Sequence, residues 1–91
     1  MVIREMLSYR WGNKEIVTSP SFGEVEMVLV QPNTRTKEFE PLLTIKTENG
    51  IHERISVGVS GVIHSIQVKK GDRVIPGMVL AYIKDDLMES V

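Results

Sequence analysis

The sequence contains no cysteine, which excludes disulfide bonds, thiolate metal ligands and cysteine nucleophiles. It also has little net charge, because 11 Lys and Arg are interspersed with 12 Asp and Glu. Without a broad charged surface, we expect neither a nucleic-acid nor a membrane partner. Long hydrophobic runs are missing too, since Arg4, Glu5 and Arg10 interrupt the apolar start of the chain. We therefore expect a cytoplasmic protein without a signal peptide or membrane span.

The apolar residues that are present favour β-strands. Valine and isoleucine, with 12 and 9 residues, make up 21 of the 38 apolar positions. Their branched Cβ atoms restrict χ1 in a helix and pack well on a pleated sheet. A chain of 91 residues is long enough for one core and too short for two. The composition thus predicts a single all-β domain.

The chain matches itself at an offset of 38 residues. The matching pairs include Gly23 with Gly61, Val25 with Ile63, Val28 with Ile66, Val30 with Val68, Leu42 with Leu80, Ile45 with Ile83 and Lys46 with Lys84. We interpret this as two structural copies, residues 16–48 and 54–86. Neither copy is long enough to bury an apolar face alone, so the two are predicted to interlock about an approximate twofold axis.

Each copy carries signals for one bend and one tight turn. The apolar alternation slips between Val25 and Val28, and again at the equivalent place in the second copy, which predicts a β-bulge or sharp bend. Asn33 and Gly71 occupy equivalent turn positions and both tolerate a positive φ. Residues 75–78, Ile-Pro-Gly-Met, predict a type II turn followed by a strand over residues 79–84.

A hairpin is predicted between the two copies. The apolar faces of its strands fall on odd-numbered residues on both sides, so cross-strand partners must have an even sum. A two-residue turn at Asn49-Gly50 fails this condition. A three-residue loop, Glu48-Asn49-Gly50, satisfies it, pairs Thr47 with Ile51 and places Gly50 at the left-handed position of a G1 bulge.

Several motifs resemble a known family. They are Gly61-Val62, then Val68, Gly71, Asp72 and Val74, then Gly77 and Leu80, with a weaker match at Pro20, Gly23, Leu42, Leu43 and Ile45. The pattern resembles biotinyl and lipoyl carrier domains over about residues 16–86. The resemblance implies a flattened barrel-sandwich hybrid of two small sheets, in which the central hairpin displays a lysine for biotin or lipoate.

The chain departs from this family at the hairpin tip. Alignment from Leu42-Leu43 places Asn49 where the family has its lysine, and neither Glu48 nor Gly50 supplies an amine. We therefore expect no cofactor, and a non-catalytic binding or assembly module rather than an enzyme. One alternative is a genuine biotin or lipoate carrier modified at Lys46. A further alternative is a relative of membrane-fusion adaptor proteins, which insert a long helical hairpin at this tip.

Residues 1–15 form an N-terminal arm outside the repeat. Four of its large apolar residues are our candidate partner surface: Ile3, Leu7, Tyr9 and Trp11. The arm is expected to be an added strand or a short helix over residues 3–10, and the tail 87–91 to be mobile. The partner is expected to be a protein, either an enzyme that binds carrier domains or a second copy of the chain.

The sequence offers no catalytic or metal-binding constellation. His52 and His64 lie on different predicted strands, and a zinc site usually needs three or four ligands, so we expect no metal. There is no motif in which a nucleophile stands beside a base, and no glycine-rich phosphate loop.

Overall fold

The computed structural model describes residues 2–6, 9–11 and 14–85, with side chains described from residue 15 to residue 84. All regular elements in these ranges are β-strands, which confirms the predicted all-β class. The strands are β1 (Val2–Met6), β2 (Tyr9–Trp11), β3 (Lys14–Thr18), β4 (Gly23–Val28), β5 (Arg35–Thr36), β6 (Leu43–Thr47), β7 (His52–Val57), β8 (Gly61–Ile66), β9 (Arg73–Val74) and β10 (Val79–Asp85).

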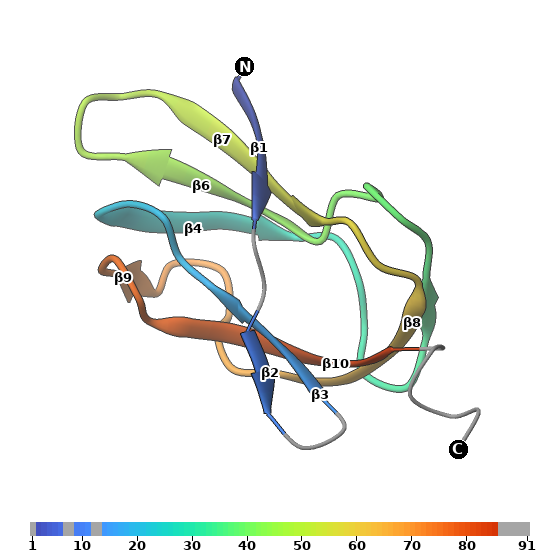
Figure 1. The fold of residues 1–91 in the computed structure, drawn as a ribbon. Helices are drawn as coiled ribbons and strands as arrows, with labels where there is room; N and C mark the ends of the chain where they lie inside the picture. Colours follow the sequence, from blue (N-terminus) through green and yellow to red (C-terminus); the bar gives the residue numbers. More distant parts are fainter. Residues whose placement is uncertain (1, 7–8, 12–13, 86–91) are drawn as a thin grey trace.

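The strands form two sheets that face each other (Figure 1). One sheet has the order β1-β7-β6-β4-β9 and the other has the order β2-β3-β10-β8-β5. Within each sheet the four strands outside the arm pair antiparallel. The arm adds one strand to each sheet, with β1 parallel to β7 and β2 antiparallel to β3. This is the predicted flattened barrel-sandwich hybrid.

The twofold repeat is visible in the strand order. Strands β4 and β8 begin and end 38 residues apart, and so do β5 and β9. The order β7-β6-β4-β9 in one sheet becomes β3-β10-β8-β5 in the other when each strand is exchanged for its equivalent. Each sheet therefore takes two strands from each copy, and the copies interlock as predicted. The repeat begins slightly earlier than residue 16, because β3 starts at Lys14.

The predicted bends are β-bulges at equivalent positions. Between β4 and β6 the register shifts after Val25, so Glu26 has no cross-strand partner. Between β8 and β10 the register skips His64 in the same way. Glu26 and His64 are themselves 38 residues apart. A bulge bends its strand and increases its twist, which lets the two small sheets wrap round one core.

The predicted turn geometry is also confirmed. Asn33 and Gly71 have φ angles of 66° and 94°. Gly77 has a φ of 85°, and the amide of Met78 donates to the carbonyl of Ile75 at 3.0 Å, as a type II turn requires. The sequence did not indicate that Phe39, which is equivalent to Gly77, would have a φ of 61°.

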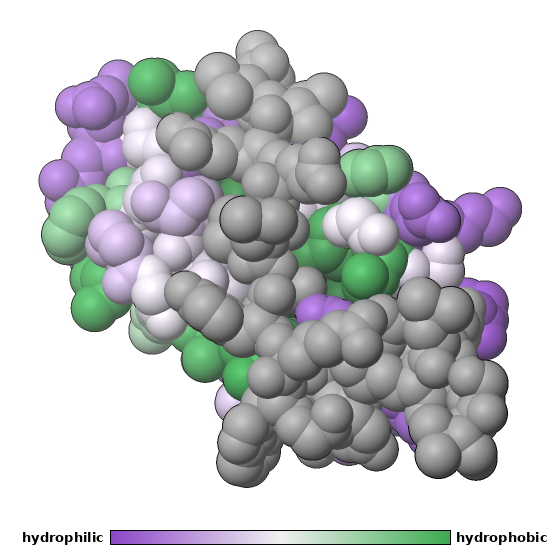
Figure 2. Space-filling model, viewed as in Figure 1, coloured by the Kyte–Doolittle hydropathy of each residue, from purple (hydrophilic) through white to green (hydrophobic). Residues whose placement is uncertain are grey.

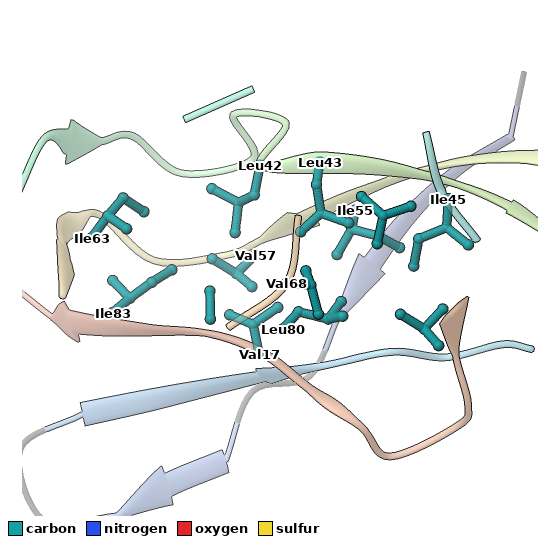
Figure 3. Close-up of a cluster of buried hydrophobic side chains, with 13 residues drawn as sticks. Val17, Leu42, Leu43, Ile45, Ile55, Val57, Ile63, Val68, Leu80 and Ile83 are labelled. Atoms are coloured by element: carbon teal, nitrogen blue, oxygen red, sulfur yellow. The ribbon is translucent and has the colours of Figure 1, made fainter. Parts of the chain in front are cut away.

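The core lies between the sheets and is shared by both copies (Figure 3). Its buried members are Val17, Val25, Leu42, Leu43, Ile45, Ile55, Val57, Ile63, Val68, Val74, Leu80, Ala81 and Ile83. Full burial of a Val, Leu or Ile side chain contributes about 1.5–3 kcal/mol. This cluster is therefore the main stabilising feature.

The arm is built as strands, which decides between the two forms expected from the sequence. Strands β1 and β2 pair with β7 and β3 at the edges of the sheets, and the helix over residues 3–10 is not formed. The mobile tail predicted over residues 87–91 lies outside the described residues. Within the described part of the chain, no helix is long and apolar enough to span a membrane.

Candidate functional site at the hairpin end

The hairpin between β6 and β7 ends in the three-residue tip of residues 48–50, as predicted. The amide of Thr47 donates to the carbonyl of Ile51 at 2.8 Å, and the amide of Gly50 donates to the carbonyl of Thr47 at 2.9 Å. Gly50 has a φ of 79°, the left-handed conformation expected for a G1 bulge. The tip is thus a closed, tight turn at one end of the molecule (Figure 1).

The tip side chains carry no amine. Glu48 supplies a carboxylate, Asn49 an amide and Gly50 only hydrogen, and all three residues are exposed. One carboxylate oxygen of Glu48 lies 3.5 Å from Nη2 of Arg73, with both side chains largely in solvent. An ion pair this exposed is weak, since its charges are well screened by water. The tip therefore offers charge and hydrogen-bonding groups, but no amine.

Lys46 is exposed on the strand rather than at the tip. It stands opposite Glu24 on β4 and opposite His52 on β7, so its backbone is held between two neighbouring strands. The three residues that separate it from Asn49 correspond to about 10 Å along an extended strand. Glu24 is also paired with Arg73 on β9, so Lys46 belongs to a cross-strand row in which an acid stands between two bases, an ordinary arrangement for a surface lysine.

A groove of about 290 Å³ lies beside the tip. Its lining residues are Pro20, Ser21, Phe22, Thr47, Glu48, Asn49, Ile51, Glu53 and Pro76. Glu53 is almost fully buried, and one of its carboxylate oxygens accepts a 2.7 Å hydrogen bond from the hydroxyl of Ser21. Glu53 has an odd number, like the apolar residues Ile55 and Val57 of β7, but no sequence pattern indicated its bond to Ser21, 32 residues away in sequence.

Sequence reasoning also missed a carboxylate beside His52. Nδ1 of His52 lies 2.8 Å from both carboxylate oxygens of Glu26, and both residues are partly or largely exposed. The bulge at Glu26 makes this contact, because it redirects a side chain that regular pairing would have placed elsewhere. His64 lies on the other sheet and is exposed. Among the described residues, no group of three His, Asp or Glu side chains is placed to hold a metal ion.

The structure divides the arm residues chosen as a candidate partner surface between the two sheets. Ile3 belongs to β1, and Tyr9 and Trp11 belong to β2, so they are on different sheets. Leu7 lies outside the described residues. The role of these four residues as a partner surface stays a prediction.

Comparison with known proteins decides the family. Residues 15–83 match the model of the Biotin_lipoyl family, described as "Biotin-requiring enzyme". The chain belongs to the biotinyl/lipoyl domain family. The match extends over most of the chain and covers both copies of the repeat. The resemblance inferred from the sequence motifs is therefore confirmed.

Two individual matches agree with this assignment. The chain is 35% identical over 69 residues to the mitochondrial methylcrotonoyl-CoA carboxylase subunit alpha of Glycine max. That match covers 76% of this chain but only 9% of the carboxylase subunit. The lipoyl domain of the 2-oxoglutarate dehydrogenase complex from Azotobacter vinelandii has the same fold, with a TM-score of 0.67 over 77% of this chain and 95% of that domain. At 22% identity this likeness concerns the fold alone.

Biotinyl/lipoyl domains are carrier parts of enzyme complexes and do not themselves catalyse the reactions of those complexes. In this chain the family fold is present with a tight central hairpin, but residues 48–50 bring no amine to its tip.

Proposed function

We propose that this chain is a biotinyl/lipoyl-like module without a covalently attached cofactor, acting in protein binding or assembly rather than as an enzyme. The observation that carries the proposal is the tip itself. It is closed by two backbone hydrogen bonds and displays a carboxylate and an amide where a carrier needs a lysine. An amide nitrogen is not an acyl acceptor under the conditions in which an amine is, because its lone pair is delocalised.

Attachment of biotin or lipoate is an acyl transfer to the ε-amine of a lysine. The amine must attack in its neutral form and must be held in the geometry of the reaction. A tight turn meets this demand because it projects its side chain away from the fold. Lys46 does not meet it, since its backbone is paired on both sides by β4 and β7.

The competing function is a carrier modified at Lys46. The exposure of the Lys46 side chain is the observation that favours it, because a ligase can contact an exposed amine. The third possibility inferred from the sequence, an adaptor with a long helical hairpin, has less support. The central hairpin closes within three residues, between Thr47 and Ile51.

The intact mass of the protein tests the proposal. Purified from its own cells, and separately after co-expression with biotin and lipoate ligases, the chain is expected to show its unmodified mass. A lipoyl domain with its lysine, produced in the same cells, serves as the control for ligase activity. A biotinyl or lipoyl adduct on the wild-type chain would contradict the proposal. Loss of that adduct in Lys46→Arg would then assign the chain to the carriers.

The proposal includes two kinds of protein partner, an enzyme or a second copy of the chain. The curated relative is a subunit of a carboxylase, and the structural neighbour is a domain of a dehydrogenase complex. A module that keeps their fold keeps a shape that enzymes of these classes are built to hold. The other kind of partner is a second copy of the chain, for which the hairpin end offers a specific surface.

A further inference from the structure

Of the seven exposed large apolar residues that the structure describes, four lie in the segments that meet at the hairpin end, and Met27, Leu29 and Phe39 lie elsewhere. We define the hairpin-end patch as Phe22, Ile51, Ile75, Pro76 and Met78. Four of these are large side chains with exposed fractions of 55% for Phe22, 44% for Ile51, 57% for Ile75 and 39% for Met78. Figure 2 shows hydrophobic residues at the lower left of the molecule, on the side where Figure 1 places β9, with hydrophilic residues above them at the hairpin tip.

Contacts between three segments hold this patch together. The amide of Ser19 donates to the carbonyl of Met78 and the amide of Gly77 donates to the carbonyl of Ser19, both at 2.9 Å. The amide of Glu48 donates to the carbonyl of Phe22 at 3.2 Å. The groove beside the tip is lined by patch residues from each of the three segments. Phe22, Ile51 and Pro76 therefore share one groove, and backbone hydrogen bonds through Ser19 tie the turn of residues 75–78 to it.

The twofold repeat supplies an internal control for this patch. The turn of residues 75–78 reads Ile-Pro-Gly-Met, whereas the equivalent turn of residues 37–40 reads Lys-Glu-Phe-Glu. Both turns are exposed, and they lie at opposite ends of the molecule (Figure 1). Phe22 is likewise equivalent to Ser60. The same backbone thus tolerates polar and charged residues, so the fold does not require apolar ones at the hairpin end.

Exposed apolar surface that the fold does not require is typical of a contact site. We propose that the hairpin-end patch is the contact surface of a symmetric dimer of this chain. This inference rests on the proposed function, because a dimer formed here covers the tip that a carrier must present. The hairpin end would then serve for assembly instead of for display of a cofactor.

Charge argues for a second copy as the occupant. The rim of the patch carries Glu48 and Arg73, an exposed acid and an exposed base 3.5 Å apart. In a twofold contact the same surface meets itself, so Arg73 of one copy can face Glu48 of the other and the reverse. A net charge of -1 adds little repulsion between copies. A surface with both charges on its rim is complementary to itself.

Sedimentation of the purified full chain over a wide range of concentrations tests the proposal. The weight-average mass is expected to rise with concentration from the 10.3 kDa of one chain to twice that value. Phe22→Ser places at the patch the residue that the other copy has at the equivalent position. It is expected to weaken dimerisation by about tenfold or more, as loss of a buried aromatic anchor does.

Phe39→Ser is the matched control. Phe39 is 54% exposed, almost the same as Phe22, but it belongs to the turn of residues 37–40 and not to the patch. Its substitution is expected to leave the dimer unchanged. A circular dichroism spectrum and melting curve of each variant separate loss of contact from loss of fold.

A charge exchange gives a second test that does not depend on the apolar residues. Glu48→Arg and Arg73→Glu are each expected to weaken the dimer, because like charges then meet across the axis. The double variant restores one acid and one base on each rim, so it is expected to recover the wild-type association. Failure of the double variant to recover would overturn the predicted arrangement.

Two other outcomes overturn the dimer. One is a wild-type chain that stays monomeric at all concentrations, and the other is a dimer lost in Phe39→Ser but kept in Phe22→Ser. A monomer with unmodified mass leaves the proposed function standing and contradicts only the dimer. A biotinyl or lipoyl adduct contradicts the proposed function, whatever the sedimentation shows.

Discussion

At the scale of single residues, the turns show how the two copies solve one backbone problem with different side chains. Asn33 and Gly71 share a left-handed conformation that both residue types adopt readily. Phe39 and Gly77 share another, with φ angles of 61° and 85°, although phenylalanine is poorly suited to it. The amides of both residues donate to equivalent carbonyls, Val57 for Phe39 and Ser19 for Gly77. The backbone bonding is therefore what fixes Phe39 in place.

Exchange of the residues at positions 39 and 77 is predicted to have opposite effects on the free energy of unfolding. A side chain in the left-handed region is less stable by about 1–2 kcal/mol than in the right-handed one. Glycine relieves that strain but loses about 0.5–1 kcal/mol more to chain entropy. We expect Phe39→Gly to leave stability unchanged or raise it by up to about 1 kcal/mol, and Gly77→Phe to lower it by about 1 kcal/mol.

Urea unfolding at equal protein concentration measures both variants of this pair. Nothing lies within 4 Å of a Cβ placed on Gly77, so its substitution reports on the backbone without a steric clash. A marked loss of stability in Phe39→Gly would show that the phenyl ring contributes through packing, despite its exposure.

At the scale of elements, the features that could be predicted from the sequence are the hairpin register and the bulge, because hydrophobic periodicity and turn chemistry determine them. The odd-numbered apolar residues of the two strands required an even register sum, and Leu43 is indeed paired with Ile55. The phase slip after Val25 predicted the bulge, because a slip in alternation has few other causes. These features depend on neighbours in the sequence and on one adjacent strand.

Other features of the site depend on residues that are distant in sequence. The contact of His52 with Glu26 spans 26 residues, and the bond of Ser21 to Glu53 spans 32. Both arise where a bulge or a loop from one copy meets a strand of the other. No local pattern determines which loop side chain will reach a given strand, so neither contact was predicted. The arm was ambiguous because its apolar residues fit both a strand and a helix.

Close approach of β4 and β6 gives a prediction at this scale. A Cβ on Gly23 would collide with the backbone carbonyl of Lys46 and lie 2.9 Å from Cγ2 of Ile45, whereas a Cβ on Gly50 meets nothing within 4 Å. We expect Gly23→Ala to destabilise by roughly 2–3 kcal/mol, because the strands must move apart. Gly50→Ala is expected to destabilise by about 1 kcal/mol through its positive φ alone.

Thermal or urea unfolding of these two alanine variants measures the difference. Equal effects at the two glycines would contradict the assigned strand packing, since only Gly23 has a neighbour within reach. Because Gly50 belongs to the tip and Gly23 does not, the pair also separates damage to the hairpin from damage to the sheet.

At the scale of the whole molecule, the two copies form one cooperative unit. Each sheet contains two strands from each copy, so neither copy can complete a sheet alone. The buried cluster is divided in the same way, with Val17, Val25 and Ile45 on one side and their equivalents Ile55, Ile63 and Ile83 on the other. Internal symmetry of this kind gives a small chain one core, and leaves it two ends that sequence changes can alter independently.

Division of the chain at the hairpin tests this interlocking. A fragment of residues 1–50 lacks β7, β8, β9 and β10, which are the partners of β6, β5, β4 and β3. A fragment of residues 51–91 lacks β3, β4, β5 and β6, which are the partners of β10, β9, β8 and β7. Below about 70 residues a core seldom provides enough stability by itself, and here each fragment would expose its half of the core to water. We expect each fragment alone to show the circular dichroism of an unfolded chain, and the equimolar mixture to regain strand signal. Cooperative unfolding of either fragment by itself would show that the copies are separate domains, and that the twofold axis joins two units instead of completing one.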